Sequence, residues 1–368
     1  MRILIYNDIS CHIGGAESFA YQLMEACKER GHTLKFFSFH SKPVSRKKLH
    51  NKAWYVACNQ LAHTHLIRRF SAELSDFQPD LIHCHNNYYY TASICKVIAD
   101  SGIPAISTIH DYDLIAPFLS SKGSPLQKLK QRQFGHIMKV SQKITSPTHQ
   151  LIGRLSHLSK EKFVYLPLFV DFDKWPFNPE SFQNPTQIAF LGRIIEDKGV
   201  FILLEAFRLL QQKYKQARLC FVGGGSDLLK LKEKARSSGL ESFTCFTDYA
   251  PHERVITILR SSRFLVLSSI YQELFGLVGI EAQALGLPVI AADVGGVSEW
   301  CIQGETGYLY EAQNHQDLFQ KMEFLLEHPE VGKNLAQQAY QQIKEKYTKE
   351  LSINYLLSHY QSLLKTAS

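Results

Sequence analysis

Apolar, β-rich runs alternate with stretches of helical periodicity along nearly the whole chain. This alternation is typical of βαβ units, in which a buried strand is followed by a helix and then by a parallel strand. The first unit is clear: residues 2–7 predict a strand, residues 16–30 predict a helix with Phe19 and Leu23 on one face, and residues 32–39 predict the next strand. The pattern favours an α/β fold built on parallel sheets.

A proline-rich segment divides the strands into two series. Residues 171–185 contain Pro176, Pro179 and Pro185, which favour an extended connector over a helix or an inner strand. The later strands of the first series are predicted at residues 81–85, 105–110, 143–146 and 163–167. Those of the second are predicted at residues 187–192, 218–222, 243–246, 264–268 and 288–292.

The length of 368 residues is enough for two domains. We expect one domain over residues 1–172, a second over residues 173–345, and a final helical segment over residues 346–368. Two Rossmann-like, doubly wound parallel-sheet domains that face each other leave a cleft between the carboxyl ends of their strands. Open α/β sheets bind ligands at that edge.

Composition excludes several classes of protein. The eight cysteines are scattered without a Cys-x-x-Cys pair, so neither a disulfide scaffold nor a zinc ribbon is expected, and the thiols are expected to be reduced and mostly buried. No run of about 18 apolar residues predicts a membrane span. The apolar run at residues 3–6 is too short for a signal peptide. The expected location is the cytoplasm.

Basic residues concentrate in the first half of the chain. Residues 1–172 carry 21 Lys and Arg against 12 Asp and Glu, whereas the remainder carries 20 against 22. Residues 30–72 and 114–160 contain no acidic residue at all. Charge blocks of this kind usually mark a surface that binds a partner.

The first acid-free block has the composition of a helix that lies on a membrane. Its basic residues stand beside aromatic and aliphatic ones at roughly helical spacing, which suits anionic headgroups. The alternative that Trp54, Leu61 and Leu66 are core residues and the cations are merely solvated stays open. The residues in question are Arg46, Lys47, Lys48, Lys52, Trp54, Tyr55, Val56, Leu61, Leu66, Ile67, Arg68 and Arg69, with Lys128, Lys130, Arg132 and Lys139 in the second block.

Two strand-to-helix loops contain candidate phosphate-binding residues. Gly14 and Gly15 lie between the first strand and its helix, where a backbone can approach a phosphate at a helix N-terminus. Arg193 and Lys198 stand five residues apart on another such loop, so two cations can converge on one diphosphate. The alternatives are a turn without a ligand and two solvated surface cations. The run Gly223 to Ser226 lacks the third glycine of a dinucleotide fingerprint.

The most informative segment is residues 272–296. Glu273 precedes a Phe-Gly-Leu-Val turn (Phe275, Gly276, Leu277, Val278), and Glu281 follows eight residues later inside a predicted helix. Two separated carboxylates with backbone amides between them suit a sugar nucleotide. Eight helical residues span about 12 Å, which disfavours the roughly 5 Å carboxylate pair of a retaining glycoside hydrolase. A salt-bridged helix face is the other alternative.

Histidines follow two strands of the first domain. His110 ends a predicted strand on the cleft side, where it can contact a substrate or simply be a satisfied strand-end residue. His83, Cys84 and His85 resemble a metal-binding sequence, but alternation along a strand places the two histidines on one face and the cysteine on the other. No metal site is predicted.

These segments together resemble the family 4 glycosyltransferases, which have the GT-B fold, and the resemblance covers essentially the whole chain. It rests on the loop from Gly14 to Glu17, residues 80–86, the strand ending at His110, residues 146–148, Arg193 with Lys198, and the spacing of Glu273 and Glu281. It implies transfer of a sugar from a nucleoside diphosphate sugar to an acceptor hydroxyl, with retention of anomeric configuration. No cofactor and no metal are implied beyond the donor, of UDP or GDP type.

The resemblance also implies roles for individual residues. Gly14 and Gly15 would contact the donor phosphates, Arg193 and Lys198 would neutralise the diphosphate, and the amides from Phe275 to Val278 would hold donor groups. Glu281 would bind ribose, Glu273 would hold hydroxyls of the donor sugar, and His110 would lie beside the reacting sugar. Glu273 and His110 are therefore the candidate catalytic residues. The final helix would cross back to the first domain.

The expected partners are a nucleotide-sugar donor, a glycan or lipid-linked acceptor and, through the basic N-terminal domain, an anionic membrane surface, as in surface polysaccharide biosynthesis. Residues 168–171 depart from the family pattern before the linker, which leaves the role of the hinge-side positions open. Thr247 and Asp248 depart from it where the resemblance implies the base pocket, which leaves the identity of the nucleotide base open. The alternatives are a GT-B epimerase or phosphorylase and a catalytically silent binding module. Nucleic-acid binding explains the basic half but not the carboxylates.

Overall fold

The computed structural model describes residues 1–7, 15–39, 63–85, 91–110, 112, 115, 125–178 and 186–367. Residue contacts divide the chain into two compact units. Unit 1 comprises Met1–Leu168 with Lys349–Ser368, and unit 2 comprises Phe169–Thr348. The C-terminal segment therefore belongs to the unit that holds the N-terminus. The boundaries predicted from the sequence are 172/173 and 345/346.

Unit 1 is built on six parallel strands in the order β2-β1-β3-β4-β5-β6. The chain moves from β1 outward to β2 and then returns to β3 on the other side of β1. The topological switch point therefore lies between β1 and β3, at the edge where such sheets bind ligands. The strands are β1 (Arg2–Asn7), β2 (Thr33–Phe37), β3 (Leu81–His85), β4 (Ala105–Thr108), β5 (Lys143–Ser146) and β6 (Phe163–Tyr165).

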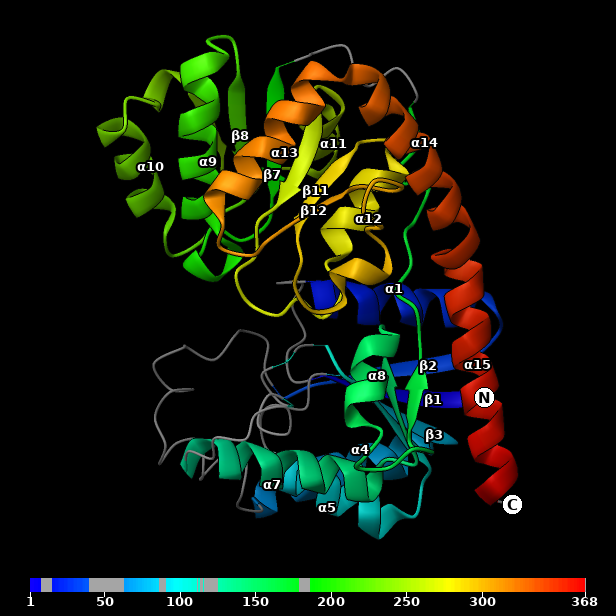
Figure 1. Ribbon diagram of the computed structural model, residues 1–368. Coiled ribbons are helices and arrows are strands. Elements are labelled where there is room, and N and C mark those ends of the chain that lie inside the picture. Colours follow the sequence, from blue (N-terminus) through cyan, green and yellow to red (C-terminus); the bar gives the residue numbers. More distant parts are fainter. Residues whose placement is uncertain are drawn as a thin grey trace. The chain divides into compact units, whose positions relative to one another are not determined.

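Helices cover both faces of this sheet (Figure 1). Helices α4, α5 and α7 lie side by side on one face, and α1 and α15 lie on the other. Because both faces are covered, β1 and β3 are apolar and buried along most of their length. The helices are α1 (Gly15–Glu29), α4 (Thr64–Phe77), α5 (Thr91–Ser101), α7 (Pro125–Val140), α8 (His149–Leu155) and α15 (Lys349–Ala367).

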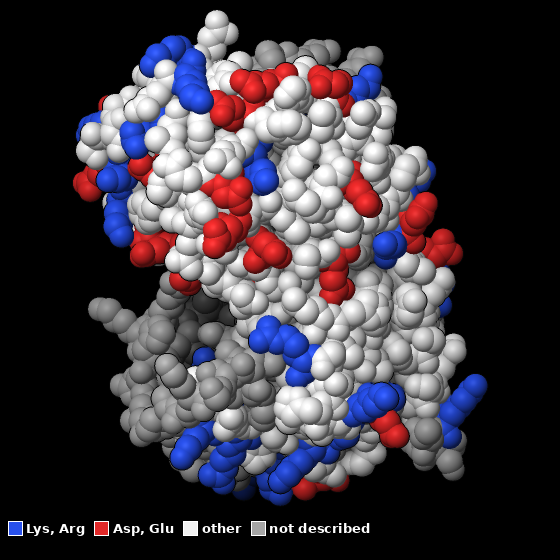
Figure 2. Space-filling model, in the orientation of Figure 1, with Lys and Arg blue, Asp and Glu red and all other residues white. Residues whose placement is uncertain are grey.

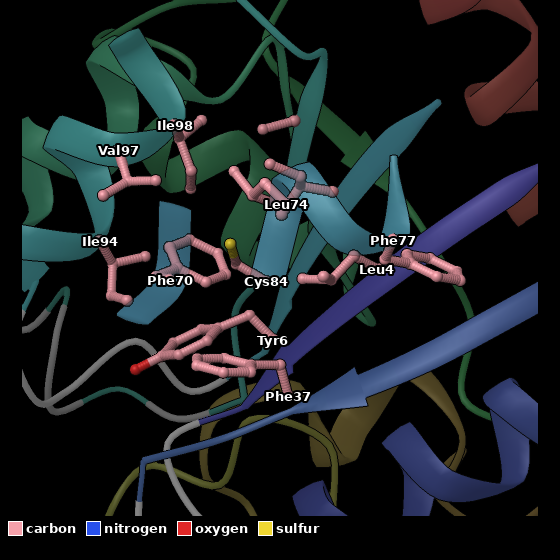
Figure 3. Close-up of a cluster of buried hydrophobic side chains, with 12 residues drawn as sticks. Leu4, Tyr6, Phe37, Phe70, Leu74, Phe77, Cys84, Ile94, Val97 and Ile98 are labelled. Carbon is pink, nitrogen blue, oxygen red and sulfur yellow. The ribbon is translucent and has the colours of Figure 1, made fainter. Parts of the chain in front are cut away.

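Aromatic and aliphatic side chains fill the layer between the sheet and helices α4 and α5 (Figure 3). The ring of Tyr6 lies 5.8 Å from that of Phe70, and the ring of Phe37 lies 5.1 Å from that of Phe70. Cys84 belongs to this cluster, whereas His83 and His85 point to the opposite face with their rings 4.1 Å apart. The predicted alternation along β3 is therefore confirmed.

Leu66 on α4 is a core residue. The hypothesis that it inserts into a membrane is wrong, because its side chain is only 7% exposed. Ile67 also packs partly against the core cluster, while Arg68 and Arg69 are exposed. The remaining residues of that proposed membrane helix, from Arg46 to Leu61, lie outside the described residues.

Helix α15 is held to unit 1 by polar contacts as well as by packing. The Ser352 hydroxyl donates to the carbonyl of Pro167, and a hydrogen bond of 2.6 Å joins the Tyr360 hydroxyl to Nδ1 of His83. Tyr360 is fully buried. The last helix of the chain thus contacts the strand end that carries the histidines.

Unit 2 has a second six-stranded parallel sheet, in the order β12-β11-β10-β7-β8-β9. The chain runs from β7 outward to β8 and β9 and then returns to β10 on the other side of β7. This is the Rossmann order, and its switch point lies between β7 and β10. The strands are β7 (Gln187–Leu191), β8 (Arg218–Val222), β9 (Thr244–Thr247), β10 (Phe264–Leu267), β11 (Val289–Ala292) and β12 (Tyr308–Tyr310).

Helices flank this sheet too: α9 contacts α10 and α13, and α12 contacts α14 (Figure 1). None of the helices in the described residues is long and apolar enough to cross a membrane. The helices are η1 (Glu196–Lys198), α9 (Val200–Lys213), α10 (Leu228–Ser237), η2 (Glu241–Phe243), α11 (His252–Arg260), α12 (Leu277–Ala284), η3 (Gly295–Glu299), α13 (His315–Glu327) and α14 (Pro329–Lys346).

Candidate active site

Two loops of unit 2 meet at the switch point between β7 and β10. The Ile270 amide donates to the Asp197 carbonyl at 3.0 Å, and the Ser268 hydroxyl donates to the Lys198 carbonyl at 2.8 Å. Gly199 makes this approach possible, because a Cβ atom there would lie 1.7 Å from the Ser268 carbonyl oxygen. Its φ of +66° also favours glycine. The loops are therefore held together by hydrogen bonds at a distance that requires glycine at position 199.

Lys198 and Glu273 form an ion pair across these loops. The Nζ atom of Lys198 lies 2.5 Å from Oε1 of Glu273, and the two side chains are 20% and 7% exposed. The hydroxyl of Ser269 donates to the same carboxylate oxygen. Tyr271 accepts a hydrogen bond from Lys198 at 3.0 Å and donates to Oε2 of Glu273 at 3.1 Å. Two residues predicted from the sequence thus meet in one hydrogen-bonded cluster, which we call the Lys198 cluster (Lys198, Ser269, Tyr271 and Glu273).

The charges in this cluster set the protonation of its members. Burial alone would lower the pKa of Lys198, but the Glu273 carboxylate and the Tyr271 hydroxyl outweigh it, and the pKa of Lys198 is raised. Burial, followed by the charge of Glu273, raises the pKa of Tyr271. At neutral pH Lys198 is therefore an ammonium group and Tyr271 a neutral phenol.

Arg193 supplies a second cation on the loop that follows β7. Its side chain is exposed and, among the described residues, has no ion-pair or hydrogen-bond partner. Its charge acts on the Tyr271 phenol, which places it in the electrostatic neighbourhood of the Lys198 cluster. Arg193 is therefore free to bind an anion.

The glycines after β8 shape the Arg193 loop. The Ile194 amide donates to the Gly224 carbonyl at 2.8 Å. A Cβ atom on Gly223 would lie 2.1 Å from the Gly192 carbonyl oxygen, and one on Gly225 would lie 2.1 Å from that of Ile194. This glycine run, which is no dinucleotide fingerprint, lets two loop backbones touch.

The predicted Phe-Gly-Leu-Val turn forms the start of α12. Gly276 caps the helix with a φ of +84°, and Glu281 lies within the helix as expected. The amides of Phe275, Gly276, Leu277 and Val278 donate no hydrogen bond to any described residue. A helix N-terminus with free amides attracts anions. The Phe275 ring itself is buried, and its carbonyl accepts a hydrogen bond from Trp300 Nε1 at 2.5 Å.

The carboxyl group of Glu281 has no hydrogen-bond or ion-pair partner within the described part of the chain, although its backbone carbonyl accepts from the Leu285 amide at 3.2 Å. Although the residue keeps some exposed area, the surrounding protein is dense enough that burial raises the pKa of its carboxyl to about 8. Among the described residues, Glu281 therefore takes no part in a salt-bridged helix face. The carboxyl group is available to hydroxyl groups of a ligand.

His110 lies in unit 1, where it belongs to a row of three imidazoles. His110 Nε2 lies 2.8 Å from Nδ1 of His85, and the His85 ring is tilted by 33° against that of His83. Nε2 of His83 contacts the Thr108 hydroxyl at 2.7 Å. Burial lowers the pKa of His83 and of His110 to about 3, and lowers that of His85 well below its usual range. All three imidazoles are neutral at pH 7. Nε2 of His85 is buried and has no hydrogen-bond partner in the part of the chain that the structure describes.

The glycine loop of unit 1 is only partly described. Gly15 is the first residue of α1, and Gly14 lies outside the described residues. Their predicted contact with donor phosphates stays a prediction.

No group of three or more His, Cys, Asp or Glu residues in the described ranges could hold a metal ion. The sequence does contain two Asp-x-Asp triplets, at residues 111–113 and 171–173. The first includes residues outside the described ranges, and in the second Asp171 accepts from the Asp173 amide and pairs with Lys174 at 3.4 Å.

The six described cysteines are free thiols, five of them buried, with Cys245 exposed.

Sequence reasoning missed Ser269 and Tyr271. Both lie on the irregular loop between β10 and α12, where no periodicity assigns a direction to a side chain. Their contacts with Glu273 depend on how that loop folds back against Lys198. No sequence signal identified them.

Two doubly wound sheets, with an ion pair and a helix N-terminus at the switch point of the second, define the class of nucleotide-binding α/β proteins. Comparison with known proteins gives the family. The family model described as "Glycosyltransferase Family 4" matches residues 13–174, and the model described as "Glycosyl transferases group 1" matches residues 171–342. The chain belongs to the family 4 glycosyltransferases and has the GT-B fold.

Individual relatives are distant. A glycogen synthase of Mycobacterium tuberculosis is 24% identical over 277 residues, which cover 73% of this chain and 65% of the relative, slightly less than two thirds of its length. A sucrose-phosphate synthase structure from Thermosynechococcus elongatus aligns over 100% of both chains with a TM-score of 0.81 and 18% identity. Anabaena HepE in complex with UDP and glucose aligns over 98% of this chain and 99% of that chain, with a TM-score of 0.76 and 17% identity.

Proposed function

We propose that this protein transfers a hexose-type sugar from a UDP or GDP sugar to an acceptor hydroxyl, with retention of anomeric configuration and without a metal ion. One observation carries the proposal. An ammonium–carboxylate pair, Lys198 with Glu273, lies at the switch point of unit 2, where the Arg193 side chain has no partner among the described residues. Cations and backbone amides bind a diphosphate, and a carboxylate accepts hydrogen bonds from sugar hydroxyls. The solved structure of HepE contains UDP and glucose, which supports this donor class.

The cations act on the leaving group. As the bond between the anomeric carbon and the donor diphosphate breaks, negative charge grows on the departing oxygen. Arg193, the remaining N–H of Lys198 and the amides from Phe275 to Val278 stabilise that charge, because they are already oriented when it forms. The acceptor oxygen forms the new bond to the anomeric carbon, and its proton passes to the departing phosphate.

The two glutamates bind hydroxyl groups of the donor. Glu273 orients the sugar hydroxyls, while Glu281 binds the ribose. In unit 1, His110 presents a neutral imidazole, whose pKa burial lowers to about 3, so it acts as a hydrogen-bonding group and not as a cation. Gly14 and Gly15 contact the phosphates from the N-terminus of α1. Nothing in this scheme requires a protein base.

Turnover with a panel of UDP and GDP sugars tests this function. We expect free nucleoside diphosphate to appear only when donor and acceptor glycan are both present, the rate to be unchanged by EDTA, and proton NMR of the product to show the donor's anomeric configuration. Release of nucleoside diphosphate without acceptor, or epimerised donor, would instead support an epimerase or a hydrolytic reaction. Activity with a sugar phosphate and no nucleotide would support a phosphorylase.

We further propose a lipid-linked acceptor at the inner face of a membrane, in the assembly of a surface polysaccharide. Helix α7 carries exposed Lys128, Arg132 and Lys139 and has no acidic residue. Lys and Arg side chains gather over the part of unit 1 where α7 lies, whereas acidic side chains are more frequent over unit 2 (Figure 2). Each basic residue near an anionic membrane surface contributes about 1 kcal/mol to the free energy of membrane binding, and salt weakens this attraction.

Flotation with liposomes tests the membrane proposal. We expect the protein to float with anionic but not neutral vesicles at low salt. Replacement of Lys128, Arg132 and Lys139 by glutamate should abolish flotation, whereas the same change at exposed Lys213, Lys230 and Arg236 of unit 2 should not. Failure to float with either vesicle would remove the membrane and favour an acceptor in solution.

A further inference from the structure

Tyr271 joins the two charged side chains of the Lys198 cluster. Its hydroxyl accepts a hydrogen bond from Lys198 Nζ at 3.0 Å and donates one to Glu273 Oε2 at 3.1 Å. The Lys198 ammonium also lies 4.9 Å from the centre of the tyrosine ring. A single phenol thus restrains the cation and the carboxylate at once.

The two oxygens of Glu273 have different partners. Oε1 accepts from Lys198 and from Ser269. Within the described residues, Tyr271 is the one side chain that donates to Oε2. If the Tyr271 hydroxyl were removed, Oε1 would keep its hydrogen bonds to Lys198 and Ser269, but Oε2 would lose its donor. The carboxylate could then rotate out of its present orientation.

The three N–H donors of Lys198 are also used differently. Two of its three N–H donors are directed to Glu273 and to Tyr271. The third N–H can donate to the diphosphate of the donor. As negative charge grows on that diphosphate, the diphosphate competes with Glu273 for the Lys198 ammonium. Tyr271 keeps a hydrogen bond to Glu273 whichever way Lys198 turns, because its own proton and not that of Lys198 makes that bond.

We propose that Tyr271 is a positioning residue for sugar transfer, which keeps the Glu273 carboxylate oriented toward the donor sugar while Lys198 serves the leaving diphosphate. This inference rests on the function proposed above, and it assigns a role to a residue outside the binding pattern predicted from the sequence. The phenol does not contact the reacting atoms in this role. It acts through Glu273.

A positioning role separates catalysis from nucleotide binding. Nucleoside diphosphates lack the sugar, so they do not report on the orientation of Glu273. Donor turnover does, since the interaction of the carboxylate with sugar hydroxyls strengthens as the sugar approaches the transition state. A side chain that only supports the loop would instead affect stability, or change binding and turnover together.

Tyr271→Phe tests the inference, with Tyr214→Phe as its control. The Tyr214 hydroxyl also donates to a glutamate of unit 2, Glu327, at 2.5 Å, but on the surface and away from the Lys198 cluster. Calorimetry gives the dissociation constant for UDP and GDP, and steady-state kinetics give kcat and KM for the donor sugar. Thermal unfolding shows whether each variant is folded.

We expect Tyr271→Phe to lower kcat by roughly 10- to 100-fold, as for other lost hydrogen bonds that strengthen in the transition state, with nucleoside diphosphate affinity within about twofold of wild type. Tyr214→Phe should match wild type in kcat and in nucleoside diphosphate affinity. Equal loss of affinity and turnover in Tyr271→Phe, or no loss, would overturn the positioning role and leave the proposed transferase intact. A wild-type protein that transfers no sugar would overturn both proposals.

Discussion

Lys198 and Glu273, which are 75 positions apart in the sequence, form an ion pair of 2.5 Å at the switch point of the second sheet. Each follows a strand that neighbours the other in that sheet, β7 for Lys198 and β10 for Glu273. The pairing is a consequence of the Rossmann strand order, which brings the loops after these two strands together. A cation suited to a diphosphate and a carboxylate suited to a sugar are thereby held side by side.

Replacing Glu273 by glutamine should separate sugar recognition from nucleotide binding. The amide keeps the size of the side chain but loses its charge, so sugar hydroxyls are held less strongly in the transition state. We expect kcat to fall by about 100-fold or more while UDP and GDP affinity is retained. Glu323→Gln removes a carboxylate from another ion pair of unit 2, with Lys213 at 2.8 Å, and should leave kcat unchanged. Near-normal turnover of Glu273→Gln with saturating donor would contradict the assigned role.

Gly199→Ala should damage both stability and the site. A methyl group there meets the Ser268 carbonyl at 1.7 Å, so the two loops must separate and Lys198 must move. Gly239→Ala is the matched control, because Gly239 also has a positive φ, +71°, but nothing within 4 Å. We expect the control to lose about 1 kcal/mol of unfolding free energy, and Gly199→Ala to lose roughly 1 to 3 kcal/mol more and most of its turnover. Denaturant unfolding measures the difference in unfolding free energy. Equal losses in the two variants would show that the loops can move apart at residue 199 without further loss of stability, which would contradict the prediction.

Glu281 should make the protein less stable as the pH rises. Burial raises the pKa of its carboxyl from 4.5 to about 8, so the folded protein keeps a proton that the unfolded chain releases. Between pH 4.5 and about 8 the unfolded state therefore binds fewer protons, and the free energy of unfolding falls, by on the order of 3 kcal/mol by pH 7. Glu281→Gln should lack this decline, which unfolding curves at pH 5, 6, 7 and 8 would show. Parallel pH profiles for the variant and wild type would contradict the buried carboxyl.

The histidine row in unit 1 should produce the opposite dependence. Burial lowers the pKa of His83 from 6.5 to about 3, so the unfolded chain takes up protons below pH 6.5 that the folded protein does not. Stability should decline as the pH falls through this range, by about 2 kcal/mol for His83 alone at pH 5. NMR of ¹³C-labelled histidine should show His83, His85 and His110 unchanged from pH 8 to pH 5, with His110→Gln used for assignment. Titration of any of the three near pH 6.5 would contradict their burial.

The strands could be predicted because most of them are short, buried and apolar. Predicted strands at residues 2–7, 81–85 and 143–146 coincide with β1, β3 and β5. The edge strand β12 (Tyr308–Tyr310) was not predicted, because three residues between turns are too few to show an alternation of apolar and polar side chains. The helices from residue 314 onward are present as predicted, in α13, α14 and α15.

The candidate site was less predictable than the fold, since its geometry depends on loops. Motif spacing identified Lys198 and Glu273, whose positions follow from the strands before them. It did not identify Tyr271, which reaches both through the path of a loop, or the contact of His83 with Tyr360 of the last helix. It also could not distinguish Leu66 on a membrane from Leu66 in the core, because an amphipathic helix has the same pattern in either setting.

Calorimetric titration of UDP and GDP into wild type, Lys198→Met and Lys213→Met tests the central claim most directly. Lys213, like Lys198, pairs with a glutamate of unit 2, but on the exposed surface. We predict that one of the two nucleotides binds wild type and Lys213→Met equally. Lys198→Met should bind it about 10- to 100-fold more weakly, because a charged hydrogen bond to the diphosphate is lost. Equal affinity in all three proteins, or no binding of either nucleotide to wild type, would contradict a diphosphate site at Lys198.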